Sequence, residues 1–184
     1  MVKAIETKYN GYRFRSRLEA RWAVFFDALE VQWEYEKEGF ELSTGKRYLP
    51  DFWLPDNNLW VEIKGDQPDF HYTSMLENFC DSIDQPLLLA VGLPSNYNTQ
   101  LLCWDVGDSS AGGPTGWQVH IAAIQRGELR FGSTDLRAHR TLYADGLFEK
   151  EIEVLRLAEV EVLPLVWKAA DKAKSARFEF GESG

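Results

Sequence analysis

The stretch that most constrains how this chain can fold is 47–64, where two apolar runs flank a cluster of turn-forming residues. The cluster at 55–58 reads Pro-Asp-Asn-Asn, four side chains that favour turns. The run before it, 47–54, is rich in aromatic and apolar residues. In the run after it, 59–64, Leu, Val and Ile alternate with Trp, Glu and Lys. The pattern predicts a β-hairpin with strands at 47–54 and 59–64.

The register of this hairpin brings charged side chains together. A turn centred in the middle of the four turn residues places Leu54 opposite Leu59 and Asp51 opposite Glu62. Opposed residues share one face of a sheet with Cβ atoms roughly 4.5–5.5 Å apart, and Lys64 shares that face because side chains alternate. Opposed like charges destabilise a sheet, so something must offset the repulsion. A divalent cation bridged by both carboxylates is the obvious candidate.

The competing interpretation of this hairpin is a solvated face with an incidental Glu–Lys pair. Charged residues are common on exposed strand faces. Here, however, Trp53 and Trp60 flank the charges and Pro50 precedes Asp51. A wholly solvated face would not need so much aromatic surface, which favours a buried, functional site.

Composition bounds the class of protein. The 184 residues fit one domain, and 45% apolar residues allow a sizeable core. Cys80 and Cys103 form neither a disulfide framework nor a zinc-binding pattern, which fits a reducing cytoplasm. A polar N-terminus without a signal peptide and short apolar runs predict a cytoplasmic protein with no membrane span. The net charge of −9 argues against strong non-specific binding of polyanions.

The N-terminal region is locally basic, with six Lys and Arg against two Glu over residues 1–21. Residues 1–15 are expected to form an irregular or short-strand arm, in which interleaved aromatic side chains suit contacts with bases or sugars. The candidates for contacts with nucleic acid are Tyr12, Arg13, Arg15, Arg17 and Arg21. The alternative is a solvated arm whose aromatic side chains cap the core, followed by a solvated helix face.

A helix is predicted over 17–29, because Ser16 and Glu19 form an S-x-x-E capping box before an apolar stripe. The stripe consists of Leu18, Trp22, Phe25, Phe26 and Leu29. Glu19 lies beside this stripe, so its carboxylate can point toward the core sheet. The alternative is that Glu19 only caps the helix.

The remaining elements follow from periodicity and turn signals. The run 86–92 is continuously apolar between turn residues, as in a strand covered by helices on both faces. The helix over 164–178 is basic; a contact with nucleic acid and a solvated face are the two interpretations, and we favour the solvated face. Further strands are predicted at 31–36, 39–42, 99–106, 117–124 and 128–132, further helices at 69–83 and 147–157, and a loop at 107–116.

The predicted order helix–strand–strand–strand–helix–strand, with Glu19, Pro50-Asp51 and Glu62-Ile63-Lys64, resembles the PD-(D/E)XK nuclease superfamily. Ten residues separate Asp51 from Glu62, close to the family spacing. The resemblance covers about residues 12–92, and the segment 14–26 also looks like small nucleases of phages and their bacterial hosts. The chain departs from one exonuclease branch, because no Gln-x-x-x-Tyr motif follows Lys64.

The resemblance implies an α/β (α+β mixed) fold with a restriction-endonuclease-like αβββαβ core, in which a central mixed sheet is flanked by helices. It implies a nuclease core at 1–95 and a C-terminal extension of strands and helices at 96–184 that completes the same domain. It also implies Mg²⁺, with Mn²⁺ able to substitute, held by Asp51, Glu62 and the backbone carbonyl of Ile63. Lys64 would orient or activate the attacking water, and Glu19 would bind a metal or its water.

Two functions remain open on this basis. The first is a metal-dependent DNA endonuclease in the cytoplasm of a bacterial host cell, encoded by the host or by a phage. A homodimer or a partner nuclease or recombination subunit would be compatible with this function, although no stretch of the sequence marks a dimer interface. The second is a non-catalytic module that binds nucleic acid or protein on the same fold, such as a subunit of a nuclease complex or a phage-encoded inhibitor. The spacing of His and Cys supports no other metal-dependent hydrolase.

Overall fold

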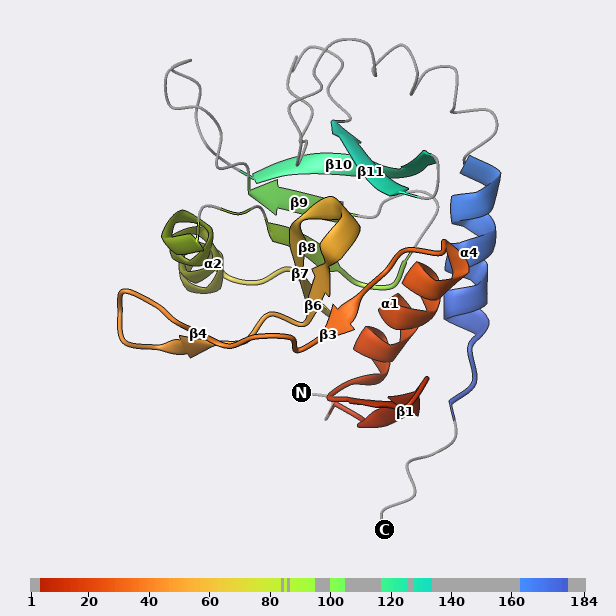
Figure 1. The fold of residues 1–184 in the computed structure, drawn as a ribbon, viewed down its shortest axis with the longest axis horizontal. Helices are drawn as coiled ribbons and strands as arrows, with labels where there is room; N and C mark the ends of the chain where they lie inside the picture. Colours follow the sequence, from red (N-terminus) through yellow and green to blue (C-terminus); the bar gives the residue numbers. More distant parts are fainter. Residues whose placement is uncertain are drawn as a thin grey trace.

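The chain folds into a mixed α/β structure in which helices cover a central mixed sheet (Figure 1). The computed structural model describes residues 4–83, 85, 87–94, 100–104, 117–125, 128–133 and 163–178. The predicted helix 147–157 and loop 107–116 lie outside the described residues. Within that part of the chain, no helix combines the length and the apolar character that crossing a membrane would require.

The central sheet has seven strands in the order β11-β10-β9-β8-β7-β6-β3. Its strands are β3 (Glu34–Tyr35), β6 (Phe52–Leu54), β7 (Leu59–Lys64), β8 (Leu87–Val91), β9 (Gln100–Trp104), β10 (Trp117–Gln125) and β11 (Glu128–Ser133). The pair β7–β8 is parallel and the other described pairs are antiparallel. Three strands after residue 96 therefore extend the same sheet as the predicted hairpin.

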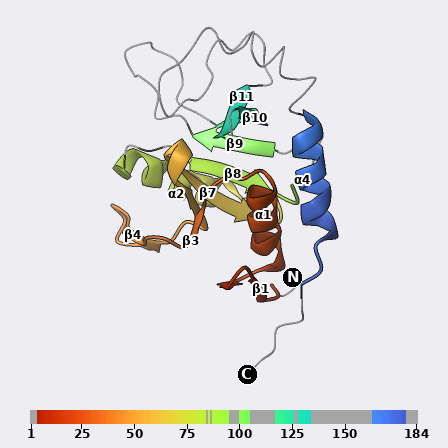
Figure 2. The same ribbon diagram turned by 45° about the vertical axis from the view of Figure 1, so that its right-hand side comes forward.

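Three helices pack against the sheet, and two small hairpins complete the described fold. The helices are α1 (Arg17–Ala28), α2 (Phe70–Ile83) and α4 (Leu163–Ser175). The hairpins are β1 (Thr7–Tyr9) with β2 (Tyr12–Phe14), and β4 (Phe40–Glu41) with β5 (Arg47–Tyr48). Figures 1 and 2 show α1 and α4 side by side on one side of the sheet and α2 on the other.

The register predicted for the central hairpin is confirmed. Leu54 lies opposite Leu59, and the pairing runs back through Trp53–Trp60 to Phe52–Val61. The turn is a single 3₁₀ turn, η1 (Pro55–Asn57), closed by Asn58 in the left-handed conformation at φ 47°.

The prediction of one continuous strand over 47–54 is wrong, because the chain forms two separate strands, β5 and β6. Pro50 lies between them and has no N–H to give to a ladder. The carbonyl of Asp51 instead accepts a hydrogen bond from the backbone N–H of Glu36 at 3.0 Å. The break separates the two strands just before the candidate site.

Because side chains alternate along β7 and β8, the residues of each of these strands lie in two cores, one on each face of the sheet. Leu59, Val61 and Ile63 pack with α1 and α4, whereas Trp60 packs with α2. The strand β8 alternates in the same way, and it is buried on both faces as its apolar run predicted. Asp51 and Glu62 therefore fall on the α2 side of the sheet.

The helix α1 begins and packs as predicted. Ser16 is its N-cap, and its side chain accepts the backbone N–H of Glu19 at 3.1 Å. Trp22, Phe25 and Phe26 are buried against the sheet. The indole of Trp22 also donates to the carbonyl of Gly92 at 3.0 Å, which ties α1 to the end of β8.

The N-terminal arm is a short hairpin anchored to the core. Asn10 and Gly11 both have positive φ between the paired residues Tyr9 and Tyr12, as a two-residue hairpin turn requires. The hydroxyl of Tyr9 donates to Asp27 in α1 at 2.7 Å, and its ring meets Phe178 edge-on. This anchoring fixes the position of Arg15, which directly follows β2 and lies beside Asp51.

Candidate active site

Two buried carboxylates, Asp51 and Glu62, form the centre of the candidate site. Each is 3% exposed. Continuing the observed pairing by one residue places Asp51 opposite Glu62. Asp51 Oδ2 also accepts a hydrogen bond from the backbone N–H of Ile63 at 2.7 Å, so it is fixed against the strand that carries Glu62.

Three side chains hold the Glu62 carboxylate. The hydroxyl of Tyr48 donates to Oε2 at 2.8 Å, and the hydroxyl of Tyr72 donates to Oε1. The ammonium of Lys64 lies 2.6 Å from the same Oε1. Glu62 is thus oriented from β5, from α2 and from its own strand.

Lys64 connects this buried centre with solvent. Its side chain is 32% exposed, and its ammonium lies 4.4 Å from the centre of the Tyr72 ring. Its backbone carbonyl accepts the N–H of Gly92 at 2.7 Å, where a φ of 79° at the end of β8 suits glycine. The strand end and the aromatic ring therefore hold the ammonium beside Glu62, partly open to solvent.

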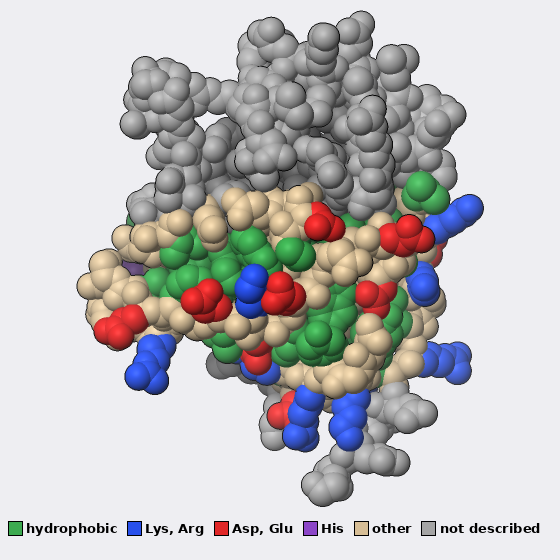
Figure 3. Space-filling model, viewed as in Figure 1, with side chains coloured by type: hydrophobic (Ala, Val, Ile, Leu, Met, Phe, Trp, Pro, Cys, Tyr) green, Lys and Arg blue, Asp and Glu red, His purple; other side chains and the backbone are tan. Residues whose placement is uncertain are grey.

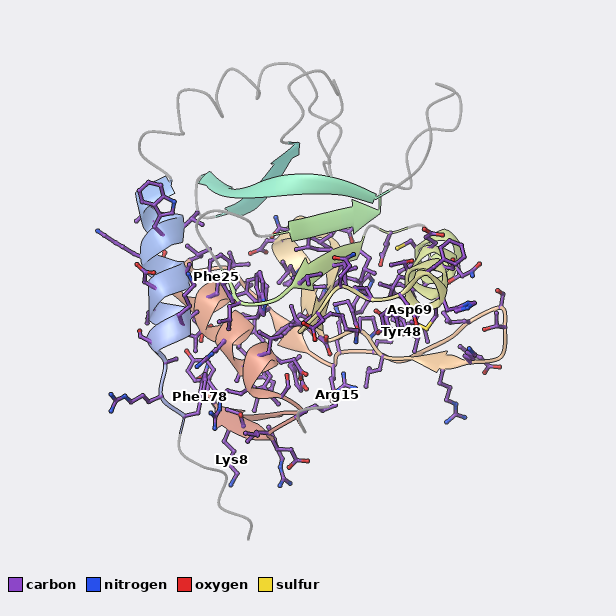
Figure 4. All side chains as sticks on the ribbon, turned by 180° about the vertical axis from the view of Figure 1, so that it is seen from behind. Lys8, Arg15, Phe25, Tyr48, Asp69 and Phe178 are labelled. Carbon is purple, nitrogen blue, oxygen red and sulfur yellow. The ribbon has the colours of Figure 1, made fainter. Side chains whose placement is uncertain are left out.

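Arg15, which follows β2, reaches the other carboxylate. Its Nη2 lies 2.8 Å from Asp51 Oδ1, and its Nε lies 2.7 Å from Glu36 Oε1. Figure 4 shows Arg15 between the β1–β2 hairpin and the region of Tyr48. The sequence placed Arg15 only among contacts with nucleic acid, whereas the structure pairs it with two carboxylates of its own chain.

Glu19 lies beside this centre at the start of α1 and is 7% exposed. Its Oε1 accepts from the Ser16 hydroxyl at 2.6 Å, and its Oε2 accepts from the Tyr35 hydroxyl at 2.7 Å and from the backbone N–H of Arg15 at 3.1 Å. Glu19 therefore points inward from the start of α1, as predicted, while Ser16 supplies the cap of the helix; the alternative that Glu19 only caps the helix is wrong.

Burial and neighbouring negative charges shift the pKa of Asp51. Burial raises its pKa well above the usual range, and the charges of Glu62 and Glu19 raise it further. The N–H of Ile63 and the ammonium of Lys64 oppose this only in part. The ionised form of Asp51 is therefore disfavoured in the folded protein, and an additional cation beside it would stabilise that form.

The tyrosines around Glu62 are permanent hydrogen-bond donors. Burial raises the pKa of Tyr48, and the negative charge of Glu62 raises it further. The same two causes, in the same order, raise the pKa of Tyr72. Both hydroxyls keep their protons at neutral pH and donate to the carboxylate rather than compete with it.

The donor atoms fit a hard divalent cation. Asp51 and Glu62 supply carboxylate oxygens, the ligands that Mg²⁺ prefers. Within a strand, the N–H and C=O of one residue point to the same side. The Ile63 N–H donates to Asp51, so the Ile63 carbonyl also points toward Asp51. The described residues contain no group of three or more His, Cys, Asp or Glu side chains arranged to hold an ion. Asp51, Glu62 and the Ile63 carbonyl are the groups that would hold an ion here, and the role of Glu19 toward a metal or its water stays a prediction.

The other predicted nucleic-acid contacts lie on the β1–β2 hairpin and on α1. Arg13 forms an exposed ion pair with Glu6 at 3.0 Å. Tyr12 is half exposed and packs on Trp33, with ring centres 4.9 Å apart. Arg17 and Arg21 are only partly exposed on α1, so the prediction of an outer, solvated face overstated their exposure.

Sequence reasoning missed four residues that orient the site, although their positions carried usable signals. Tyr72 lies three, four and seven residues before Met75, Leu76 and Phe79, on the buried side of the predicted helix. Tyr35 lies on the apolar face of the strand predicted at 31–36. For Tyr48 and Glu36, we find no comparable signal in the sequence.

Comparison with known proteins adds no relative to this picture. No family model matches the chain, and no curated protein or solved structure matches it. The case for a function therefore rests on the residues and geometry described above.

Proposed function

We propose that this chain is a metal-dependent deoxyribonuclease of the PD-(D/E)XK type, with a restriction-endonuclease-like core. The observation that carries the proposal is the convergence of Asp51, Glu62 and Lys64 on one side of the central hairpin. The order of α1, the hairpin strands, α2 and β8, with β7 parallel to β8, supports the same core.

Each residue of the site has a distinct task in this proposal. Asp51, Glu62 and the Ile63 carbonyl hold Mg²⁺ or Mn²⁺, which supplies Lewis acidity for phosphodiester hydrolysis when bound. Lys64 places a positive charge where the attacking water and the phosphate oxygens meet. Tyr72 keeps that ammonium in place, because its ring faces Lys64 and its hydroxyl binds Glu62.

The acidic net charge of −9 is compatible with a DNA substrate if positive charge is local. Basic side chains project from the lower edge of the face in Figure 3, where Figure 1 places the β1–β2 hairpin. Lys8 and Arg13 are exposed on this hairpin. The hairpin leads directly into Arg15 at the site, so a DNA backbone along it would reach the carboxylates.

The test is a cleavage assay on DNA with Mg²⁺ or Mn²⁺, using duplex, branched and single-stranded substrates. Wild-type protein should cleave at least one of them, and EDTA should stop the reaction. Asp51→Asn and Lys64→Met should each lower the rate at least about 100-fold, because the first removes a ligand of the cation and the second removes the ammonium beside the phosphate. The matched control is Asp56→Asn, which changes an exposed turn carboxylate. Equal cleavage by wild type and Asp51→Asn would exclude the proposal.

One observation favours the second function, a non-catalytic binding module on the same fold. The chain's own cations already pair with both carboxylates, Arg15 with Asp51 and Lys64 with Glu62. A module that never binds metal would need such neutralisation permanently. Calorimetric titration separates the two functions: heat of Mg²⁺ or Mn²⁺ binding favours the nuclease, and its absence together with tight binding of a protein partner favours the module.

A further inference from the structure

Arg15 pairs with two carboxylates at the candidate metal site. Its guanidinium bridges two carboxylates, Asp51 through Nη2 and Glu36 through Nε. The Asp51 side chain is 4% exposed, whereas the Arg15 side chain is 55% exposed. One side of the guanidinium therefore meets the buried centre, and about half of the side-chain surface stays open to solvent.

The second carboxylate, Glu36, is held in place by its own backbone. Its φ of 47° lies in the left-handed region, which non-glycine residues rarely adopt. In that conformation its N–H donates to the carbonyl of Asp51 at 3.0 Å while its side chain meets Arg15. Glu36 therefore contacts both Asp51, through its backbone N–H, and Arg15, through its side chain.

The backbone of Arg15 is fixed as well. Its N–H donates to Glu19 at 3.1 Å and to the hydroxyl of Tyr35 at 3.0 Å. These bonds to α1 and β3 hold the root of the side chain, while Glu36 holds the guanidinium. Arg15 would remain beside the site even if its contact with Asp51 were broken.

We propose that Arg15 neutralises Asp51 until a divalent cation arrives and then binds a phosphate of the DNA backbone, with Glu36 as the residue that positions it. This inference rests on the proposed nuclease function and adds a residue to it. A divalent cation on Asp51 repels the guanidinium, so metal binding releases Nη2 from the carboxylate. Glu36 keeps the released group near the site, and a guanidinium fork matches the oxygens of a phosphate.

This exchange couples metal and DNA. While Arg15 pairs with Asp51 it competes with the cation, so the protein alone binds metal more weakly than its carboxylates would allow. A phosphate that draws Arg15 away removes the competitor. Metal and DNA therefore strengthen each other's binding, and the coupling is reciprocal.

The test is calorimetric titration with MnCl₂ alone, without DNA, on the full chain and variants whose folding is checked by circular dichroism. Arg15→Gln should bind Mn²⁺ several-fold more tightly than wild type, because the competing charge is gone. Glu36→Gln should bind it more weakly, because Arg15 is then left to Asp51 alone. Arg13→Gln removes the same charge from the same arm, and its Mn²⁺ affinity should stay within about twofold of wild type.

A kinetic measurement completes the test. At saturating Mn²⁺, Arg15→Gln should raise the KM for DNA, and Arg15→Lys should restore it only in part, because an ammonium cannot reproduce the fork. Weaker or unchanged Mn²⁺ binding in Arg15→Gln would overturn the inference while leaving nuclease activity of the wild type intact. Absence of both Mn²⁺ binding and cleavage in the wild type would overturn the proposed function and this inference together.

Discussion

The carboxylate of Asp51 accepts the backbone N–H of Ile63 at 2.7 Å, across the turn that joins their strands. This bond locks the residue after Pro50 against the strand that bears Glu62 and Lys64. Together with the bond from the Glu36 N–H to the Asp51 carbonyl at 3.0 Å, it fixes Asp51 in the break between β5 and β6. This bond extends the β6–β7 register to the two carboxylates and keeps their charges close.

The first prediction concerns how the charges near Asp51 change the stability of the folded protein with pH. Burial and the charges of Glu62 and Glu19 raise the folded-state pKa of Asp51 above its unfolded value of about 3.9. The folded state therefore binds this proton more tightly than the unfolded state. The protein loses stability as the pH rises from the unfolded-state pKa of Asp51 to its folded-state pKa. Asp51→Asn removes the ionisation, so in EDTA at pH 8 its melting temperature should exceed that of wild type by at least about 2 °C.

Calorimetry of wild type and Asp51→Asn between pH 4 and pH 8 checks this expectation. The advantage of the variant should shrink toward pH 4, where Asp51 is protonated in the folded protein. Added Mg²⁺ should raise the melting temperature of wild type and not that of the variant. A variant less stable than wild type at every pH would show that the ion pair with Arg15 outweighs the repulsion.

The second prediction separates the two contacts of Tyr72. Tyr72→Phe loses the hydroxyl that binds Glu62 but keeps the ring 4.4 Å from the Lys64 ammonium, whereas Tyr72→Leu loses both. A cation–π contact of about 1–2 kcal/mol corresponds to roughly tenfold in rate. DNA cleavage by Tyr72→Leu should therefore be about ten times slower than by Tyr72→Phe. Equal rates for the two variants would mean that the ring does not position Lys64.

The third prediction tests the start of α1. Ser16→Ala removes the N-cap of the helix and the hydroxyl that donates to Glu19. Loss of such a cap costs about 1 kcal/mol in the free energy of unfolding, measured by urea denaturation. The matched control is Ser175→Ala, since Ser175 is exposed and bonds only to carbonyls of its own helix. A loss in the control equal to that in Ser16→Ala would contradict a specific capping role.

The parts of this fold that were readable from sequence depend on local rules. The hairpin register followed from turn chemistry, the α1 stripe from helical period, and the burial of β8 from its continuous apolar run. The Asn-Gly pair at 10–11 was a usable hairpin signal, and it distinguishes the short-strand arm from an irregular one.

The parts that were not readable depend on contacts between distant segments. Arg15 and Asp51 are 36 residues apart, and no local pattern distinguishes an arginine that pairs with a buried carboxylate from one that faces DNA. Glu36 acts through a left-handed backbone conformation that a strand pattern does not predict. The interruption at Pro50 was visible, but the apolar character of the surrounding run outweighed it in the strand prediction.

The central claim is that Asp51 and Glu62 together hold a single divalent cation, and electron paramagnetic resonance of Mn²⁺ tests it most directly. Titration of the wild-type protein should show one tightly bound ion, and Asp51→Asn and Glu62→Gln should each abolish it, while Asp56→Asn should not. A wild-type protein that leaves Mn²⁺ free in solution, or an ion that survives both substitutions unchanged, would contradict the account.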